Sequence, residues 1–277
     1  MIFTAHRSHP NHKETYFGYY KDDGFVKRKN KGRIDAYGKW PEIKEKWLSN
    51  FINRKNEAGF SVNKIVTAEI EWSAEAYMET DYSNLSDDDF IQTQLNYVTF
   101  LLGNGLSEQV SKLPFSKNKI NLNVSNWKNF EMTKLFKIQG SKTTPLLELI
   151  ECGKGKHPFV TTQATNNGIE GFYDFYSEEG NIITADSAVL GYCSYQPLPF
   201  SASDHVEKLS PKFKMNKYIA VFLVTILNLE QYRYNYGRKC SQDRMKKICI
   251  KLPNKNGNPD FEYMENYIKS LSYSSSI

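Results

Sequence analysis

The longest apolar stretch of the chain, residues 218–229, limits what the C-terminal half can fold into. Its sequence, YIAVFLVTILNL, is apolar on every side of a helix, and such a helix is stable only when other elements surround it. The stretch is also shorter than the roughly 20 residues that a membrane-spanning helix needs. We therefore predict a buried helix over residues 216–232 and a packed domain around it.

Basic and aromatic side chains are concentrated directly after this helix. Residues 228–251 read NLEQYRYNYGRKCSQDRMKKICIK, in which only Glu230 and Asp243 oppose the arginines and lysines. Guanidinium and ammonium groups neutralise phosphates, and flat tyrosine rings can stack on bases or support them. The segment therefore predicts contact with a nucleic acid. A solvated basic surface at the end of a tyrosine-rich helix is the alternative.

A second polar group lies upstream, in residues 157–173 (HPFVTTQATNNGIEGFY). This segment predicts a strand, then hydroxyl and amide side chains, then a turn at Asn167-Gly168. Hydroxyl and amide groups reach phosphates and base edges without burial, although Asn166 and Asn167 could instead only shape the turn. The candidate DNA-contacting residues of the two segments are Thr161, Thr162, Gln163, Asn166, Asn167, Arg233, Tyr234, Tyr236, Arg238, Lys239, Arg244 and Lys246.

Charge divides the chain into three segments. The net charge is +6 over residues 1–60, −8 over residues 61–110 and +7 over residues 111–277. An acidic block between two basic ones fits a linking or partner-facing element beside a DNA-facing domain. A hairpin is predicted over residues 14–37, with Lys27 to Lys31 at its tip. The tip either contacts phosphate or is a solvated turn, and the sequence leaves both alternatives open.

The order of the predicted elements indicates an α+β fold, with a mainly helical region before a C-terminal mixed domain of short strands. Helices are expected over residues 41–53, 67–79, 86–102, 216–232 and 260–271. The third of these opens with a capping box from Ser86 to Asp89. Strands are expected over residues 146–152, 159–162, 171–176, 181–185 and 247–253.

Five motifs, in one order, span about residues 124–271. They are NWKNFEMTKLFKIQGSK, PFVTTQATNNGIEGFYDF, TADSAVLGY, YRYNYGRKCSQDRMKK, and KLP followed by PDFEYMENYIKSL. Together they resemble the target recognition domain of specificity subunits from type I and related type II restriction-modification systems. The resemblance implies a non-catalytic domain that lies against duplex DNA. It also implies that the last helix begins the spacer on which such subunits dock a methyltransferase or a second recognition half.

The first hundred residues carry a second resemblance. The segments ETYFGYYKDDGFVKRKNKGRIDAYGKW and VTAEIEWSAEAYMETDYSNLSDDDFIQTQLNYVTFLL look like the region that joins an adenine DNA methyltransferase to its recognition domain. The methyltransferase body is absent, because no Gly-rich loop follows a strand and no Asn-Pro-Pro-Tyr or Asp-Pro-Pro-Tyr tetrapeptide occurs. The resemblance implies that catalysis belongs to a partner and that the chain itself uses no cofactor.

These resemblances imply a division of the chain. We expect residues 1–110 to be a methyltransferase-derived linking region, 111–125 a linker, 126–272 the target recognition domain with its spacer helix, and 273–277 a disordered tail. The expected partners are duplex DNA, an adenine methyltransferase or endonuclease subunit, and a second recognition subunit or another copy of the chain. The N-terminus lacks the apolar core of a signal peptide, so we expect a cytoplasmic protein with no membrane partner.

Spacing disfavours other chemistries. The carboxylates of residues 260–265 fit the first turn of a helix better than a nuclease centre. Residues 203–205 (Ser-Asp-His) are adjacent in sequence, which seldom gives the geometry of a triad, and Pro10 interrupts the histidines at 6, 9 and 12. The cysteines show no C-x-x-C pairing, so neither a metal site nor a disulfide framework is expected. A complete nuclease or methyltransferase, and a single-strand or RNA binder, remain the alternatives.

Overall fold

The computed structural model describes residues 6–277, which divide into two compact units. Unit 1 ends at Asp81 and unit 2 begins at Tyr82, whereas the sequence suggested a later boundary, over residues 111–125. Helix α3 (Asp87–Gly103) accounts for the difference, because it packs against α6 (Lys217–Asn228) of unit 2. The acidic block of the sequence is therefore divided between the two units.

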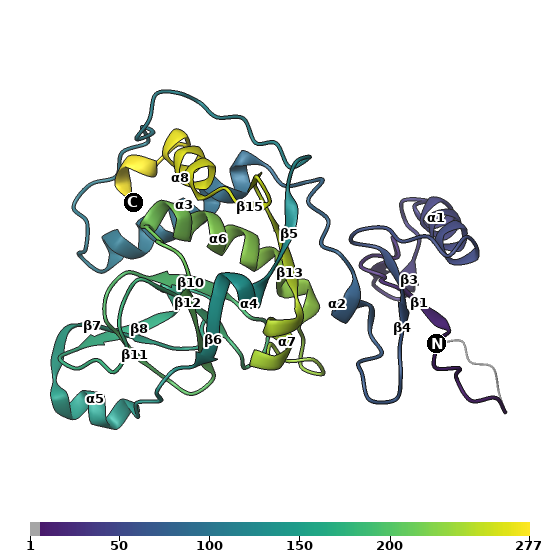
Figure 1. Cartoon of the computed structure of the whole chain (residues 1–277), viewed down its shortest axis with the longest axis horizontal. Coiled ribbons are helices and arrows are strands. Elements are labelled where there is room, and N and C mark those ends of the chain that lie inside the picture. The colour runs from purple at the N-terminus through teal and green to yellow at the C-terminus, as the bar shows by residue number, and fades with distance from the viewer. Residues whose placement is uncertain (1–5) are drawn as a thin grey trace. The chain divides into compact units, whose positions relative to one another are not determined.

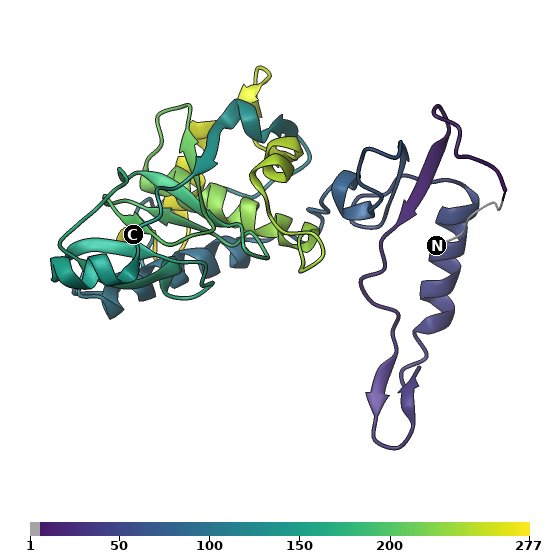
Figure 2. The ribbon, with the colours of Figure 1, turned by 90° about the horizontal axis from the view of Figure 1, so that it is seen from below.

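Unit 1 is built on a two-stranded sheet and one long helix (Figure 2). Strand β1 (Glu14–Gly18) pairs antiparallel with β4 (Ser61–Ile65), and α1 (Trp40–Ile52) contacts β1. The predicted hairpin is confirmed only between β2 (Val26–Arg28) and β3 (Gly32–Ile34), since β1 pairs outside it. The predicted helix over residues 41–53 is confirmed as α1.

The helix predicted over residues 67–79 is wrong for most of its length, since only α2 (Ala74–Tyr77) is helical. Side chains hold the preceding residues in a turn. Trp72 donates from Nε1 to the carbonyl oxygen of Thr67 at 2.8 Å, and the Tyr77 hydroxyl donates to the carbonyl oxygen of Glu71 at 2.7 Å. These bonds satisfy backbone oxygens that a helix would have used for itself.

Unit 2 is a mixed α+β domain, as the sequence predicted. Its main sheet is antiparallel, in the order β10 (Cys193–Gln196), β9 (Ile182–Asp186), β12 (Val206–Pro211) and β6 (Phe136–Gly140). A second sheet has the order β11 (Ser201–Ala202), β7 (Lys154–Val160) and β8 (Ile169–Tyr173), with β11 parallel to β7. Two ribbons join β5 (Lys128–Glu131) to β13 (Cys249–Leu252), and β14 (Asn254–Lys255) to β15 (Asn258–Pro259).

Three helices, α3, α6 and α8 (Phe261–Ser270), gather on one side of the main sheet (Figure 1). Every residue of α6 from Tyr218 to Leu227 is buried, which confirms the predicted buried helix. Asn216 fixes where it begins, because its Oδ1 accepts the backbone N–H groups of Tyr218 and Ile219, each at 3.0 Å. The chain continues from α6 into the 3₁₀ turn η2 (Leu229–Arg233).

The remaining helices are short: α4 (Met132–Leu135), α5 (Leu146–Cys152), α7 (Gln242–Lys247), η1 (Asn166–Gly168) and η3 (Ser274–Ser276). The strand predicted over residues 146–152 is wrong, because this segment forms α5. Pro145 precedes the helix, and Gly153 ends it with a φ of +84°. Leu149 packs with Phe159 and Tyr173 in a small separate core. None of the helices within residues 6–277 is long and apolar enough to cross a bilayer.

Residues 104–127 form no helix or strand, yet hydrogen bonds fasten them to the C-terminus. The backbone N–H of Ser111 donates to Ser276 Oγ and that of Phe115 to Ser274 Oγ, both at 2.7 Å. Ser116 donates in the same way to the carbonyl oxygen of Lys269 at 2.8 Å. The tail expected to be disordered is thus part of unit 2, and Ser274 is fully buried.

One carboxylate joins α1 to the segment that follows it in unit 1. Asn50 on α1 donates from Nδ2 to Glu57 Oε2 at 2.8 Å, and Lys46 Nζ lies 2.8 Å from Glu57 Oε1. The hydrogen bond from Lys46, followed by that from Asn50, lowers the pKa of Glu57 from 4.5 to about 2. Because the ionised form is favoured in the folded state, its stabilisation is complete above the unfolded pKa and is lost as the pH falls from 4.5 toward 2.

We expect Glu57→Gln to destabilise unit 1 by about 1 to 2 kcal/mol at neutral pH, a range discounted because the carboxylate is partly exposed. The variant should also lose the pH dependence of stability between pH 4.5 and pH 2. Hydrogen exchange of peptides from residues 40–65 measures both effects. Glu45→Gln, at an exposed position of α1, is the control. Equal protection in wild type and Glu57→Gln at neutral pH would contradict the assignment.

Candidate nucleic-acid interface

A tight turn follows η2 and carries an exposed tyrosine. Asn235 and Arg238 exchange backbone hydrogen bonds of 3.0 and 2.9 Å, and the N–H of Gly237 donates to Asn235 Oδ1 at 2.8 Å. Tyr236 lies at the tip, where 87% of its surface is exposed. A fixed backbone thus holds an aromatic ring in solvent, where it is available to stack on a base.

Basic side chains lie on the elements next to this turn. Helix α7 packs against α4 and β6, and Arg244 on α7 donates from Nη1 to the carbonyl oxygen of Lys239 at 2.9 Å, which ties the helix to the turn. We use the name basic face for six exposed residues of the turn, α7, α4 and β6. They are Tyr236, Lys239, Lys246, Lys247, Lys134 and Lys137.

Two carboxylates moderate the charge of the basic face. Glu131 Oε1 lies 3.1 Å from Lys134 Nζ, and Asp243 Oδ1 lies 3.9 Å from Lys246 Nζ. Both pairs are largely exposed, and exposed ion pairs contribute little to stability. A phosphate can therefore replace either carboxylate as the partner of the lysine at small cost.

Lys134 and Lys137 were not among the sequence candidates, because each is isolated from the basic run. Lys137 belongs to β6, the edge strand of the main sheet, where Phe136 and Ile138 are buried and Lys137 is exposed. Alternation of that kind was the only signal in the sequence. It becomes informative once α7 is seen to pack beside β6.

Three of the sequence candidates lie in the interior, which corrects their expected contact with DNA. Arg233, Tyr234 and Arg238 are 4%, 5% and 8% exposed. Arg233 donates from Nε to Glu230 Oε2 at 2.5 Å, and Arg238 donates from Nη1 to the carbonyl oxygen of Arg233 at 2.7 Å. Burial also raises the pKa of the Tyr234 hydroxyl. These side chains support the turn that presents Tyr236.

The amide groups of the upstream segment face their own backbone. Gln163 Nε2 and Asn166 Nδ2 both donate to the carbonyl oxygen of Ile169, at 2.6 and 2.7 Å. Asn167 Nδ2 donates to the carbonyl oxygen of Tyr195 at 2.8 Å. This geometry favours the alternative in which these residues shape the turn.

Backbone conformation supports the same interpretation. Asn166, Asn167 and Gly168 have φ values of +50°, +56° and +77°, a left-handed region that asparagine and glycine enter more readily than other residues. Thr161 and Thr162, which directly follow β7, are half-buried. The hydroxyl groups of these threonines are the remaining base-reading candidates in this segment.

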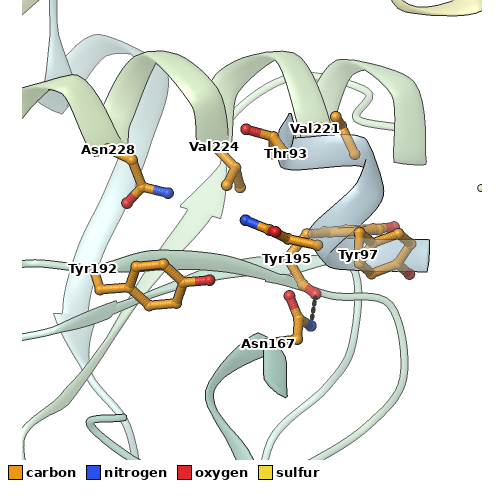
Figure 3. Close-up of a pocket in the computed structure, with 9 residues that line it drawn as sticks. Thr93, Tyr97, Asn167, Tyr192, Tyr195, Val221, Val224 and Asn228 are labelled. Atoms are coloured by element: carbon orange, nitrogen blue, oxygen red, sulfur yellow. Dashed lines mark hydrogen bonds between the residues drawn. The ribbon is translucent and has the colours of Figure 1, made fainter. Parts of the chain in front are cut away.

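A small polar pocket opens beside this turn, between α3, α6 and β10 (Figure 3). Asn228 on its wall is held by Cys193, whose N–H donates to Asn228 Oδ1 at 2.8 Å and whose carbonyl oxygen accepts from Nδ2 at 3.1 Å. The free space corresponds to roughly three water molecules, which is too little for a nucleobase. The residues lining it are Thr93, Asn96, Tyr97, Asn167, Tyr192, Tyr195, Val221, Val224 and Asn228.

The geometry offers no metal centre or triad in the part of the chain that the structure describes. No group of three or more His, Cys, Asp or Glu side chains there could hold a metal ion. His205 Nε2 lies 3.4 Å from Asp204 Oδ2, but the Ser203 hydroxyl donates to the Asp204 carbonyl oxygen at 3.2 Å. The three adjacent residues therefore do not form a relay.

Residues 124–274 match the model of the type I restriction modification DNA specificity domain. The match covers more than half of the chain, so the chain belongs to this family of restriction-modification specificity proteins. All residues of the basic face lie inside the matched range, whereas unit 1 lies outside it.

Part of the chain is also similar in sequence to a known specificity subunit. The specificity subunit S.BcgI of a type II restriction enzyme from Heyndrickxia coagulans is 31% identical over 153 residues, which cover 53% of this chain and 43% of that protein. The chain spans less than half the length of this relative.

Two solved structures of specificity subunits are similar to part of this chain. The type I S subunit from M. genitalium is 15% identical, with 66% of this chain and 45% of that chain covered and a TM-score of 0.41. The HsdS subunit from Thermoanaerobacter tengcongensis is 12% identical, with 65% of this chain and 42% of that chain covered and a TM-score of 0.38.

We expect Arg233→Met to lower the free energy of unfolding by about 3 to 5 kcal/mol, because it removes the guanidinium group that pairs with the buried Glu230 carboxylate. Adding Glu230→Leu should recover much of the loss. Denaturant unfolding followed by tryptophan fluorescence measures both variants, and Lys239→Met serves as an exposed control. Wild-type stability in Arg233→Met would show that the pair does not support the turn.

For the polar turn we expect Asn167→Ala to cost about 1 to 2 kcal/mol, through a strained left-handed backbone and a lost hydrogen bond. Asn167→Gly keeps the backbone conformation and should cost less. Thermal unfolding compares the two variants. Undiminished stability together with a loss of affinity for one DNA sequence only would instead assign Asn167 to base reading.

Proposed function

We propose that this chain is a specificity subunit, or part of one, that recognises a particular sequence in duplex DNA for a restriction-modification system. The match of residues 124–274 to the DNA specificity domain carries this proposal. The basic face adds a physical basis, since it combines exposed lysines with an exposed aromatic ring inside the matched range. In this proposal methylation and cleavage belong to a partner, and the chain acts where the DNA is, in the cytoplasm.

Phosphate contacts and base contacts have different roles in this proposal. Lys239, Lys246 and Lys247 neutralise phosphates, which fixes the position of the domain on the duplex without selecting a sequence. Tyr236 and the hydroxyl groups of Thr161 and Thr162 are the candidates for contact with bases. The amides of residues 163–167 act indirectly, by holding the turn in one conformation.

We also propose that an adenine methyltransferase or endonuclease subunit, or a second recognition half, docks on this chain. Large apolar side chains remain exposed on the segment that is fastened to the C-terminus. Leu113 is 70% exposed and Phe115 is 62% exposed. Apolar side chains that gather on one exposed segment are typical of a protein–protein contact.

The proposal is tested by the salt dependence of DNA binding. If about five phosphates are neutralised, the logarithm of the binding constant should fall with the logarithm of salt concentration at a slope of about −4 to −5. Lys246→Gln with Lys247→Gln should make the slope less negative by about 2 and weaken all duplexes alike. Fluorescence anisotropy on duplexes and matched single strands measures these quantities.

The matched control is Lys117→Gln with Lys156→Gln, which removes the same charge from exposed positions outside the basic face. A slope near zero, or an equal effect of the control variant, would contradict binding through the basic face. A clear preference for single strands would favour the single-strand alternative, with Tyr236 as its stacking residue.

A further inference from the structure

A strongly charged hairpin lies in unit 1, outside the matched domain. Strands β2 and β3 and the turn between them carry Lys27, Arg28, Lys29, Lys31 and Arg33, all of them exposed. No carboxylate occurs between Lys27 and Arg33. The hairpin is thus a local concentration of positive charge within a unit whose overall charge is nearly balanced.

The pairing of the strands places like charges opposite each other. Lys27 pairs with Arg33 across the hairpin, and like charges at such positions are destabilising. Asp23 offsets part of this repulsion, because its Oδ1 lies 2.5 Å from Arg33 Nη2. Binding of an anion would relieve the remainder.

The base of the hairpin is anchored to the start of α1. Phe25 packs edge to face on Trp40, with ring centroids 5.6 Å apart. The Asp35 carboxylate accepts the backbone N–H groups of Lys39 and Trp40 at 2.8 and 3.1 Å. Figure 2 shows the hairpin extending beyond the end of α1. The tip is therefore presented on a fixed support.

The tip itself has a defined conformation. The N–H of Lys31 donates to the carbonyl oxygen of Arg28 at 3.2 Å, and Asn30 and Gly32 adopt φ values of +61° and +70°. Arg28 is directed to Tyr37, with its Nη2 3.4 Å from the tyrosine hydroxyl. Lys27, Lys29 and Lys31 are therefore the cations best placed to meet an external ligand.

We propose that this hairpin binds the phosphate backbone of duplex DNA, as a second contact outside the specificity domain. The proposal rests on the proposed function. A short row of ammonium groups matches the closely spaced phosphates of a duplex. The exposed side chains of β2, β3 and the turn between them are cationic or polar, and the exposed ring of Tyr37 lies beside Arg28. The hairpin therefore presents mainly charge, with few of the apolar anchors that dominate binding to a protein surface. Contacts of this kind add affinity for every sequence and leave discrimination unchanged.

The test compares the full chain with a variant that carries Lys27→Gln, Lys29→Gln and Lys31→Gln. The control carries Lys13→Gln, Lys21→Gln and Lys44→Gln, which remove the same charge from exposed positions elsewhere in unit 1. Anisotropy is measured from about 50 to 200 mM salt on a duplex selected from a random pool and on its scrambled counterpart, each extended by several helical turns. The hairpin variant should bind both duplexes at least tenfold more weakly at low salt, with a slope less negative by about 2 to 3.

Three results would overturn the inference. The first is an unchanged salt slope in the hairpin variant. The second is an equal loss of DNA affinity in the control variant. The third is a hairpin variant that binds DNA as the wild type does but loses affinity for an acidic protein partner. Lys29→Glu, a single change at the exposed tip, repeats the test if the triple variant fails to fold. If the wild type shows no preference between the two duplexes but the hairpin variant still loses slope, the proposed function fails and the phosphate contact stands.

Discussion

The burial of α6 is the constraint on which the rest of unit 2 depends. An apolar helix that is buried residue by residue must be covered on every side, and α3, α8, β10 and β13 all contact it. Phe222 illustrates the packing, because its ring centroid lies 4.9 Å from that of Phe90, 5.7 Å from that of Trp127 and 6.0 Å from that of Tyr267. These rings come from four separate segments. The position of α6 fixes where η2 ends and thus where the turn of Tyr236 begins.

Buried charged side chains hold the turn of Tyr236 in one orientation. The ion pair of Arg233 and Glu230 is buried, and the Tyr82 hydroxyl donates to Glu230 at 3.3 Å. Desolvation cancels much of the attraction in such a pair, so its contribution is orientation more than stability. Arg238 then bonds to the backbone of Arg233. Two cations of the basic run therefore hold the turn in place, and others remain for a ligand.

Sequence reasoning succeeded where local chemistry decides the structure. The capping box at Ser86, the apolar run of α6 and the acidic first turn of α8 each predicted a helix within a few residues of its bounds. The strand predicted over residues 146–152 was wrong, because a short apolar run fits a strand or a helix equally well; Pro145 and Gly153, at the two ends of α5, are the local residues that favour the helix. The same limit applies to the candidate interface. A charge run shows that cations are present, but tertiary packing decides that Arg233 is buried while Lys137, alone in its segment, is exposed.

The boundary at Tyr82 also changes the electrostatic argument. Residues 82–277 contain 22 basic and 19 acidic side chains, a net charge of +3 rather than the +7 of residues 111–277. One of the added carboxylates is Asp87. Its Oδ1 accepts a hydrogen bond from the Tyr267 hydroxyl at 2.7 Å, and its Oδ2 lies 3.5 Å from Lys119 Nζ. With so small a net charge, the field of unit 2 as a whole attracts a polyanion only weakly. Attraction must then arise over distances of about a Debye length, roughly 10 Å at ordinary salt, where the lysines around Tyr236 outnumber the carboxylates beside them.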